Sequence, residues 1–261
     1  MESHSLRITL IQSDIIWENP SANLRLLADR IENSKSSTDL IILPELFTTG
    51  FTMNVSSLAE EISGVSVEWM KKLSRSMKVC LTGSLLIKEQ NCYFNRLIWM
   101  KPTGHYLTYD KRHLFRMGEE HLNYSAGKNK LIVRLKKWNI RPLICYDLRF
   151  PVWSRNVSDY DLLIYTANWP SSRQSVWETL LKARAIENQC YVIGLNRIGK
   201  DGMSINYSGD SMVIDYTGNI IRQLPANTSV SETVKLDFKK LLEFRKKFPA
   251  YLDADTFEII P

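Results

Sequence analysis

Three side chains that together could support acyl transfer each follow a predicted β-strand. Glu45 comes after the apolar run 39–43, Lys111 after 105–109 and Cys145 after 140–144. In α/β sheets, ligands collect beyond the carboxyl ends of the strands, so side chains at such ends can share one pocket. The spacing therefore favours a site that combines a carboxylate, an ammonium group and a thiol.

The combined chemistry of these groups is that of a cysteine hydrolase without histidine. A thiol reacts as its thiolate, and an ordinary pKa of ~8.5 leaves little thiolate at neutral pH. A carboxylate can take the proton as general base, while an ammonium group favours the thiolate and stabilises the oxyanion of a tetrahedral intermediate. The backbone N–H after the nucleophile, that of Tyr146, can assist. The set predicts acyl transfer on an amide or a nitrile.

Each of the three residues also has an ordinary structural interpretation. A single cysteine at a strand end is usually a small buried hydrophobic residue. Glu45 and Lys111 can simply face solvent, as most charged side chains do. Residue type and spacing alone leave both interpretations open.

The elements that must position these residues alternate between short apolar runs and amphipathic helices. Apolar residues at helical spacing, with Asn19 and Pro20 as a helix start, predict helices at 20–31, 66–78 and 175–188. Strands are predicted at 6–11, 39–43, 79–87, 93–100, 105–109, 131–136, 140–144, 161–165, 191–195, 211–215 and 220–223. Lys137, Trp138 and Asn139 are expected to form a hairpin turn. No Gly, Ser or Pro-rich linker separates the halves, so we expect one domain over 1–261, with mixed strands between helices.

Composition narrows the class of protein. The chain has 261 residues, a formal charge of +6 and 44% hydrophobic residues, which is typical of a globular protein with a large core. No apolar run approaches the ~20 residues that cross a bilayer, and the N-terminus lacks a signal-peptide core, so we expect no membrane partner and a cytoplasmic protein. The basic clusters 136–137 and 245–247 are too short for a nucleic-acid groove. The four cysteines are widely spaced and predict free thiols.

Other catalytic chemistries find little support. The four histidines form no H-x-x-x-H pattern and the cysteines no C-x-x-C, so no metal site is predicted. Phosphate-binding glycine motifs and the G-x-S-x-G of serine hydrolases are absent. Because side chains alone supply the proposed chemistry, we expect no metal or organic cofactor.

The chain resembles the nitrilase superfamily of carbon–nitrogen hydrolases in four segments that occur in the family's order, at 43–47, 109–115, 144–151 and 183–189. The resemblance implies a four-layer α-β-β-α sandwich that pairs into dimers or higher homo-oligomers. It also implies Cys145 as nucleophile, Glu45 as general base and Lys111 as oxyanion stabiliser. Many members have a second glutamate seven residues before a glycine. Gly127 points to Glu120 in this role, although Glu119 is adjacent.

Within the superfamily, the segments 47–51, 111–117 and 168–170 are most similar to the omega-amidases. These enzymes hydrolyse the terminal amide of 2-oxoglutaramate and 2-oxosuccinamate through a cysteine thioester. Such substrates carry a carboxylate, which needs a cation, and the candidates are Arg149, Arg173 and Arg116. Arg149 can equally form a structural ion pair. Phe51 and Trp169 are candidate pocket walls or core residues.

Two other functions stay open. One is another amidase of the superfamily, which would act on an N-carbamoyl compound or on deaminated glutathione. The other is a non-catalytic binding module that keeps the fold without the activity. The intact set of Glu45, Lys111 and Cys145 favours an enzyme over such a module.

Overall fold

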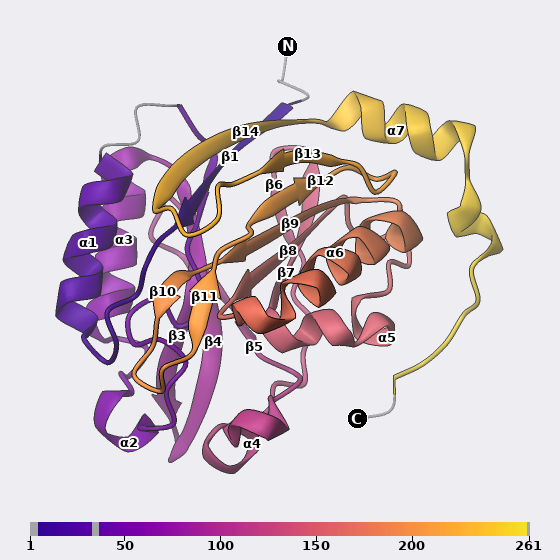
Figure 1. The fold of residues 1–261 in the computed structure, drawn as a ribbon. Helices are drawn as coiled ribbons and strands as arrows, with labels where there is room; N and C mark the ends of the chain where they lie inside the picture. Colours follow the sequence, from indigo (N-terminus) through magenta and orange to yellow (C-terminus); the bar gives the residue numbers. More distant parts are fainter. Residues whose placement is uncertain (1–4, 33–36, 260–261) are drawn as a thin grey trace.

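The computed structural model describes residues 5–32 and 37–259, whose strands form two six-stranded sheets and one two-stranded hairpin (Figure 1). The first sheet runs in the order β14 (Val230–Asp237), β1 (Ser5–Gln12), β2 (Leu40–Ile42), β3 (Cys80–Glu89), β4 (Cys92–Met100) and β5 (Tyr106–Asp110). β1, β2 and β3 are parallel, whereas β4 runs antiparallel to both β3 and β5. The carboxyl ends of β2 and β5 therefore lie at the same edge of this sheet.

The second sheet runs in the order β13 (Ile220–Gln223), β12 (Met212–Ile214), β9 (Tyr191–Asn196), β8 (Leu162–Ala167), β7 (Trp138–Ile144) and β6 (Val133–Leu135). Its three central strands, β7, β8 and β9, are parallel, so their carboxyl ends share an edge. The separate hairpin consists of β10 (Ile198–Lys200) and β11 (Asn206–Ser208).

Helices cover the outer face of each sheet. α1 (Pro20–Glu32) and α3 (Val65–Met77) pack on the first sheet, and α5 (Pro151–Ser154) and α6 (Gln174–Asn188) pack on the second (Figure 1). α1 begins at the predicted cap, where the Asn19 side chain accepts the Ala22 N–H at 3.1 Å. The shorter α2 (Val55–Leu58) and α4 (Glu120–Asn123) lie in loops, and α7 (Phe238–Lys247) follows β14. No helix in the described ranges is long and apolar enough to cross a membrane.

The main core lies between the two sheets. Leu10, Ile42 and Trp99 from the first sheet pack against Ile140 and Ile164 from the second, and all five are fully buried. Layers of sheet and helix on both sides of this core confirm the predicted α-β-β-α sandwich. The prediction of a single domain over 1–261 stays a prediction.

The turn expected at Trp138 is wrong. Trp138 begins β7 and is fully buried, with its ring 5.1 Å from that of Phe238 and 5.7 Å from that of Tyr191. The turn is made by Lys136 and Lys137 instead. Burial of a large apolar side chain contributes roughly 1.5–3 kcal/mol to the free energy of folding. The shorter turn allows this burial, because it leaves Trp138 in the strand with its indole ring in the core.

Two elements near the C-terminus were not predicted: strand β14 of the first sheet and helix α7. β14 shows the alternation of a strand from Val230 to Leu236 and pairs antiparallel with β1 along its whole length. Arg245, from the short basic cluster 245–247, links α7 to the second sheet by donating to Asp161 at 2.8 Å. The four cysteines are free thiols as predicted, and Cys92 alone among them is exposed.

Candidate active site

The Glu45 carboxylate is held on three sides where the chain leaves β2. It is fully buried, and its Oε1 accepts hydrogen bonds from Lys111 Nζ and from Asn95 Nδ2, both at 2.8 Å. Its Oε2 accepts the backbone N–H of Asn168 at 2.8 Å. These contacts fix the carboxylate in one orientation, as a positioned base requires.

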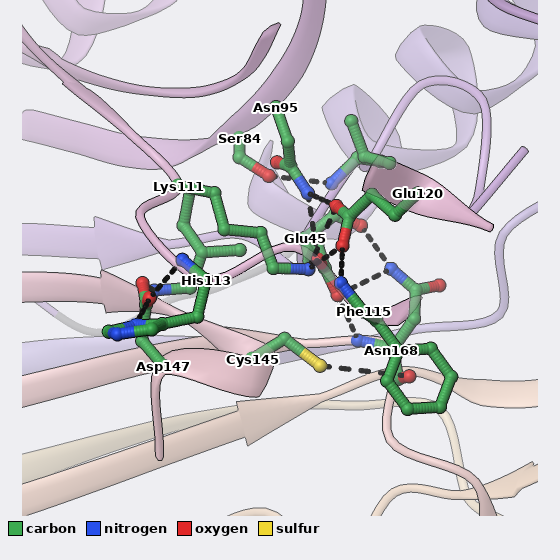
Figure 2. A network of polar contacts seen from close by, with 12 residues as sticks. Glu45, Ser84, Asn95, Lys111, His113, Phe115, Glu120, Cys145, Asp147 and Asn168 are labelled. Carbon is green, nitrogen blue, oxygen red and sulfur yellow. Dashed lines mark hydrogen bonds and ion pairs between the residues drawn. The ribbon is translucent and has the colours of Figure 1, made fainter. Parts of the chain in front are cut away.

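Lys111 directly follows β5, and its side chain reaches between two carboxylates (Figure 2). Besides Glu45, its Nζ contacts both oxygens of Glu120 at 3.0 Å. Glu120 is fully buried, whereas Glu119 is exposed and makes no side-chain contact with Lys111. Gly127 donates its N–H to the Lys111 carbonyl at 2.9 Å, and a Cβ on Gly127 would lie 2.1 Å from a backbone oxygen of Asp110.

The Lys111 ammonium offsets the charges of the two carboxylates in this buried cluster. Burial by itself would lower the pKa of the Lys111 ammonium, but the carboxylates of Glu120 and Glu45 outweigh it and hold the pKa well above its ordinary value. Burial raises the pKa of Glu120, although Lys111 opposes that rise. Lys111 therefore carries a full positive charge at neutral pH inside a site of low exposure.

Cys145 follows β7 and opens the 3-10 helix Cys145–Arg149. Its φ is +42°, a left-handed conformation that is strained for a residue with a Cβ and that is common at functional sites. Its Sγ lies 3.9 Å from the carbonyl oxygen of Asn168 (Figure 2). Burial and the nearby charge of Glu45 raise the pKa of the thiol well above its ordinary value, although Lys111 lowers it. At neutral pH the sulfur therefore keeps its proton until a base removes it.

Two asparagines in this network were not predicted as site residues. Asn168 joins Glu45 and Cys145, because its N–H donates to the carboxylate and its carbonyl faces the sulfur. Its side chain also donates to the Glu45 carbonyl at 2.7 Å. Asn168 follows β8 directly, so the strand-end rule could have found it. Asn95 lies within β4, and nothing in the sequence distinguishes it from an ordinary strand residue.

Comparisons with known proteins agree with this geometry. A family model described as carbon–nitrogen hydrolase matches residues 7–246. The chain belongs to this family. The resemblance to the nitrilase superfamily and the prediction of a carbon–nitrogen hydrolase are thereby confirmed.

Relatives of this carbon–nitrogen hydrolase match it over nearly its whole length. Omega-amidase YafV of Escherichia coli (strain K12) is 46% identical over 256 residues, which cover 97% of this chain and 98% of the relative. The 2-oxoglutaramate amidase of Bacillus subtilis (strain 168) is 32% identical over 251 residues, which cover 94% and 96%. The solved structure of XC1258 from Xanthomonas campestris, a CN-hydrolase superfamily protein with an arsenic adduct in the active site, is 42% identical. It has a TM-score of 0.96 and covers 98% of this chain and 100% of its own.

Aromatic rings line the carbon–nitrogen hydrolase site beside the cluster. Lys111 Nζ lies 5.2 Å from the centre of the Phe51 ring. The half-buried Tyr146 packs edge-on against Phe115 at 5.0 Å, and Phe115 donates its N–H to Glu120 at 2.6 Å. Trp169 is buried against α6, with its ring 5.4 Å from that of Trp177. Phe51 thus lies beside the reactive groups, whereas Trp169 is mainly a core residue.

The three candidate arginines differ in their surroundings. The exposed Arg149 lies over the Trp169 ring at 5.4 Å, and Arg173 lies over the Phe115 ring at the same distance. Arg173 also contacts the Met117 sulfur at 3.4 Å. Within residues 5–32 and 37–259, no carboxylate forms an ion pair with these two arginines, so the structural ion pair considered for Arg149 is not found. Arg116 is exposed and contacts neither Glu45, Lys111 nor Cys145.

No metal-binding cluster is found in the part of the chain that the structure describes. No three side chains of His, Cys, Asp or Glu come together there in a way that could hold an ion. The carboxylates of Glu45 and Glu120 both form ion pairs with the Lys111 ammonium. The Lys111 ammonium group thus lies between the two carboxylates and balances their charge.

Proposed function

We propose that this protein is an omega-amidase that hydrolyses the terminal amide of short 2-oxo-dicarboxylic acid monoamides, such as 2-oxoglutaramate, to the 2-oxo acid and ammonia. The observation that carries the proposal is the contact of Lys111 and Asn168 with one carboxylate, Glu45, beside the Cys145 thiol. The omega-amidase and 2-oxoglutaramate amidase among the relatives support the same reaction.

In the first half-reaction, Cys145 attacks the amide carbon while Glu45 takes the thiol proton. The raised pKa of the thiol means that this transfer accompanies attack, because free thiolate is scarce beforehand. The tetrahedral oxyanion is stabilised by the Lys111 ammonium and the Tyr146 N–H. Glu45 then gives its proton to the departing nitrogen, the C–N bond breaks, and ammonia leaves a thioester on the sulfur.

In the second half-reaction, water attacks the thioester carbon. Glu45, again a carboxylate, removes a proton from that water and returns it to the leaving thiolate, so the 2-oxo acid departs and the free thiol is restored. Glu120 holds the Lys111 ammonium in place through both steps. No group outside the protein side chains and water is needed for the atoms and charges to balance.

The substrate carboxylate needs a cation away from the reacting amide, and we assign Arg149 and Arg173 to it. Both guanidinium groups lie over aromatic rings and have no carboxylate partner within the described ranges. We assign Phe51 as an apolar wall of the substrate pocket. The Trp169 ring packs against the Arg149 guanidinium group. Arg116 is the weaker candidate, because only Arg149 and Arg173 among the three lie over aromatic rings.

A substrate panel on one preparation tests the proposal. We expect 2-oxoglutaramate to exceed glutamine, asparagine, N-carbamoyl-β-alanine and deaminated glutathione by ~10²-fold or more in kcat/KM, measured as ammonia release or, for deaminated glutathione, as release of the peptide amine. Arg149→Gln and Arg173→Gln should raise KM for the keto-acid amide by about 10–100-fold, since each removes a hydrogen bond to a charged group. Preference for an N-carbamoyl compound would instead support the alternative amidase.

Lys111→Met should lower kcat by ~10²–10³-fold, as the loss of an oxyanion donor does in other hydrolases. It should also destabilise the fold by ~3–5 kcal/mol, because Glu45 and Glu120 would face each other without the cation between them. Steady-state kinetics and thermal unfolding measure the two effects. Lys128→Met, at an exposed position, is the matched control and should change neither. A fully active Lys111→Met enzyme would remove Lys111 from the mechanism.

Pairing into a dimer or higher homo-oligomer and residence in the cytoplasm stay predictions. Size-exclusion chromatography with light scattering tests the first and cell fractionation the second. A non-catalytic module would turn over no member of the panel, and iodoacetamide labelling concentrated at Cys145 would favour the enzyme over such a module.

A further inference from the structure

The reactive groups come from different sheets, so their mutual distance is not set by strand pairing. Glu45 and Lys111 follow β2 and β5 of the first sheet, whereas Cys145 follows β7 of the second. Hydrogen bonds within each sheet hold its own strands in register but do not act across the apolar layer between the sheets. Side-chain contacts at the sheet ends must therefore place the thiol against the ammonium group.

One carboxylate that the proposed reaction does not use makes such contacts. Asp147 is fully buried, and each of its oxygens accepts two hydrogen bonds. Oδ1 accepts the His113 N–H at 3.0 Å and lies 2.8 Å from His113 Nδ1, which must carry a proton because a carboxylate only accepts. Oδ2 accepts the Tyr109 hydroxyl at 2.7 Å and the Ile144 N–H at 3.1 Å.

The positions of these partners in the chain show which two segments the contacts of Asp147 connect. Tyr109 and His113 lie two residues before and two residues after Lys111, and Asp147 lies two residues after Cys145. Asp147 therefore joins the segment that carries the ammonium group to the turn that carries the thiol, as Figure 2 shows for His113. Its bond to the Ile144 N–H also closes the turn in which Cys145 has a φ of +42°.

We call the hydrogen bonds of Asp147 to Tyr109, His113 and Ile144 the joint. Neighbouring side chains hold the members of this joint in place. Tyr109 accepts the indole N–H of Trp153 at 3.0 Å while it donates to Asp147. Burial and the charge of Asp147 raise the pKa of Tyr109 well above its ordinary value, so the phenol remains a donor. The His113 ring stacks on Phe150 with 3.8 Å between the ring centres.

We propose that Asp147 is a positioning residue that sets the distance between the Lys111 ammonium and the Cys145 sulfur, with His113 as its partner. The inference rests on the proposed function for its kinetic readout. A displacement of about 1 Å between reacting groups can cost ~10²-fold in rate without weakening substrate binding. Disruption of the joint should therefore lower kcat and leave KM nearly unchanged, whereas a purely structural role would lower only the folded fraction.

Asp147→Asn tests the joint directly. It keeps the shape of the side chain but turns an NH₂ group toward two donors, so we expect kcat per folded site to fall by ~10²-fold, with KM changed by less than about threefold. Asp161→Asn is the matched control, because Asp161 is also buried and accepts a backbone N–H, from Asn139 at 2.9 Å, and an arginine. The control should lose stability and keep kcat per folded site.

A pair of variants at His113 separates the hydrogen bond from packing, and decides the question if Asp147→Asn does not fold. His113→Phe keeps the stacking on Phe150 and removes the side-chain donor, so kcat should fall about tenfold. His113→Asn places an N–H near the position of Nδ1 and loses the stacking, so kcat should stay within about threefold of the parent. Equal kcat values for both variants and the parent, or a loss confined to KM, would overturn the inference.

A second readout does not depend on the substrate. The rate at which iodoacetamide alkylates Cys145, followed by peptide mass in a Cys92→Ala background, should fall about tenfold in Asp147→Asn and His113→Phe. If the parent hydrolyses no amide, the proposed function fails, while the alkylation rates still test the joint. If the parent is active and both Asp147→Asn and His113→Phe alkylate and turn over like it, the joint fails and the proposed function stands.

Discussion

Replacing Cys145 with alanine should abolish amide hydrolysis, with kcat lowered on the order of 10⁵-fold or more. No other thiol can substitute for it, because Cys80 and Cys190 are buried elsewhere and Cys92 is on the surface, at the start of β4. The measurement is ammonia release from 2-oxoglutaramate at saturating substrate. Cys145→Ser should be as inactive, since a hydroxyl holds its proton far more tightly than a thiol and Glu45 alone cannot remove it.

The matched control for this prediction is Cys92→Ala, which should turn over like the parent. Because Cys92 is exposed, the parent will take up iodoacetamide at both residues, and labelling of Cys145 is best counted in the Cys92→Ala background. A Cys145→Ala enzyme that still releases ammonia at the parent's rate would show that the thiol is not the nucleophile.

Glu45→Gln should lower kcat by on the order of 10⁴-fold, because the same carboxylate serves both half-reactions as base. Glutamine can still accept from Lys111 and Asn95, but its NH₂ group would face the Asn168 N–H. Glu119→Gln is the matched control, since Glu119 is exposed and makes no side-chain contact with Lys111, and it should keep full activity.

The pH dependence of alkylation gives a separate check on Glu45. The negative charge of Glu45 disfavours the thiolate and raises the pKa of Cys145, so its removal should lower that pKa. Alkylation of Glu45→Gln should therefore rise through a midpoint at lower pH than in the parent, although amide hydrolysis is lost. An unchanged midpoint together with unchanged turnover would mean that the carboxylate does not act on the thiol.

Much of the fold, and three candidates for the reactive groups, follow from the sequence alone. Short apolar runs alternate with amphipathic helices, and this pattern predicts mixed strands between helices. The four-layer order was implied by the resemblance to the nitrilase superfamily. Glu45, Lys111 and Cys145 could be selected because each follows a strand, and strand pairing brings β2 and β5 to one edge of the first sheet. Local pattern succeeds here because the period of a strand and the place where it ends are properties of neighbouring residues.

Only the tertiary structure decided how the two sheets meet. It brought Glu120 rather than Glu119 to Lys111, and it placed Asn168 between the base and the thiol. Asn95 and Asp147 gave no signal, since a polar residue within a strand or a turn has the same appearance whether it is solvated or joins two sheets. Such contacts depend on the orientation of side chains from distant segments across an apolar layer, and no local pattern contains that information.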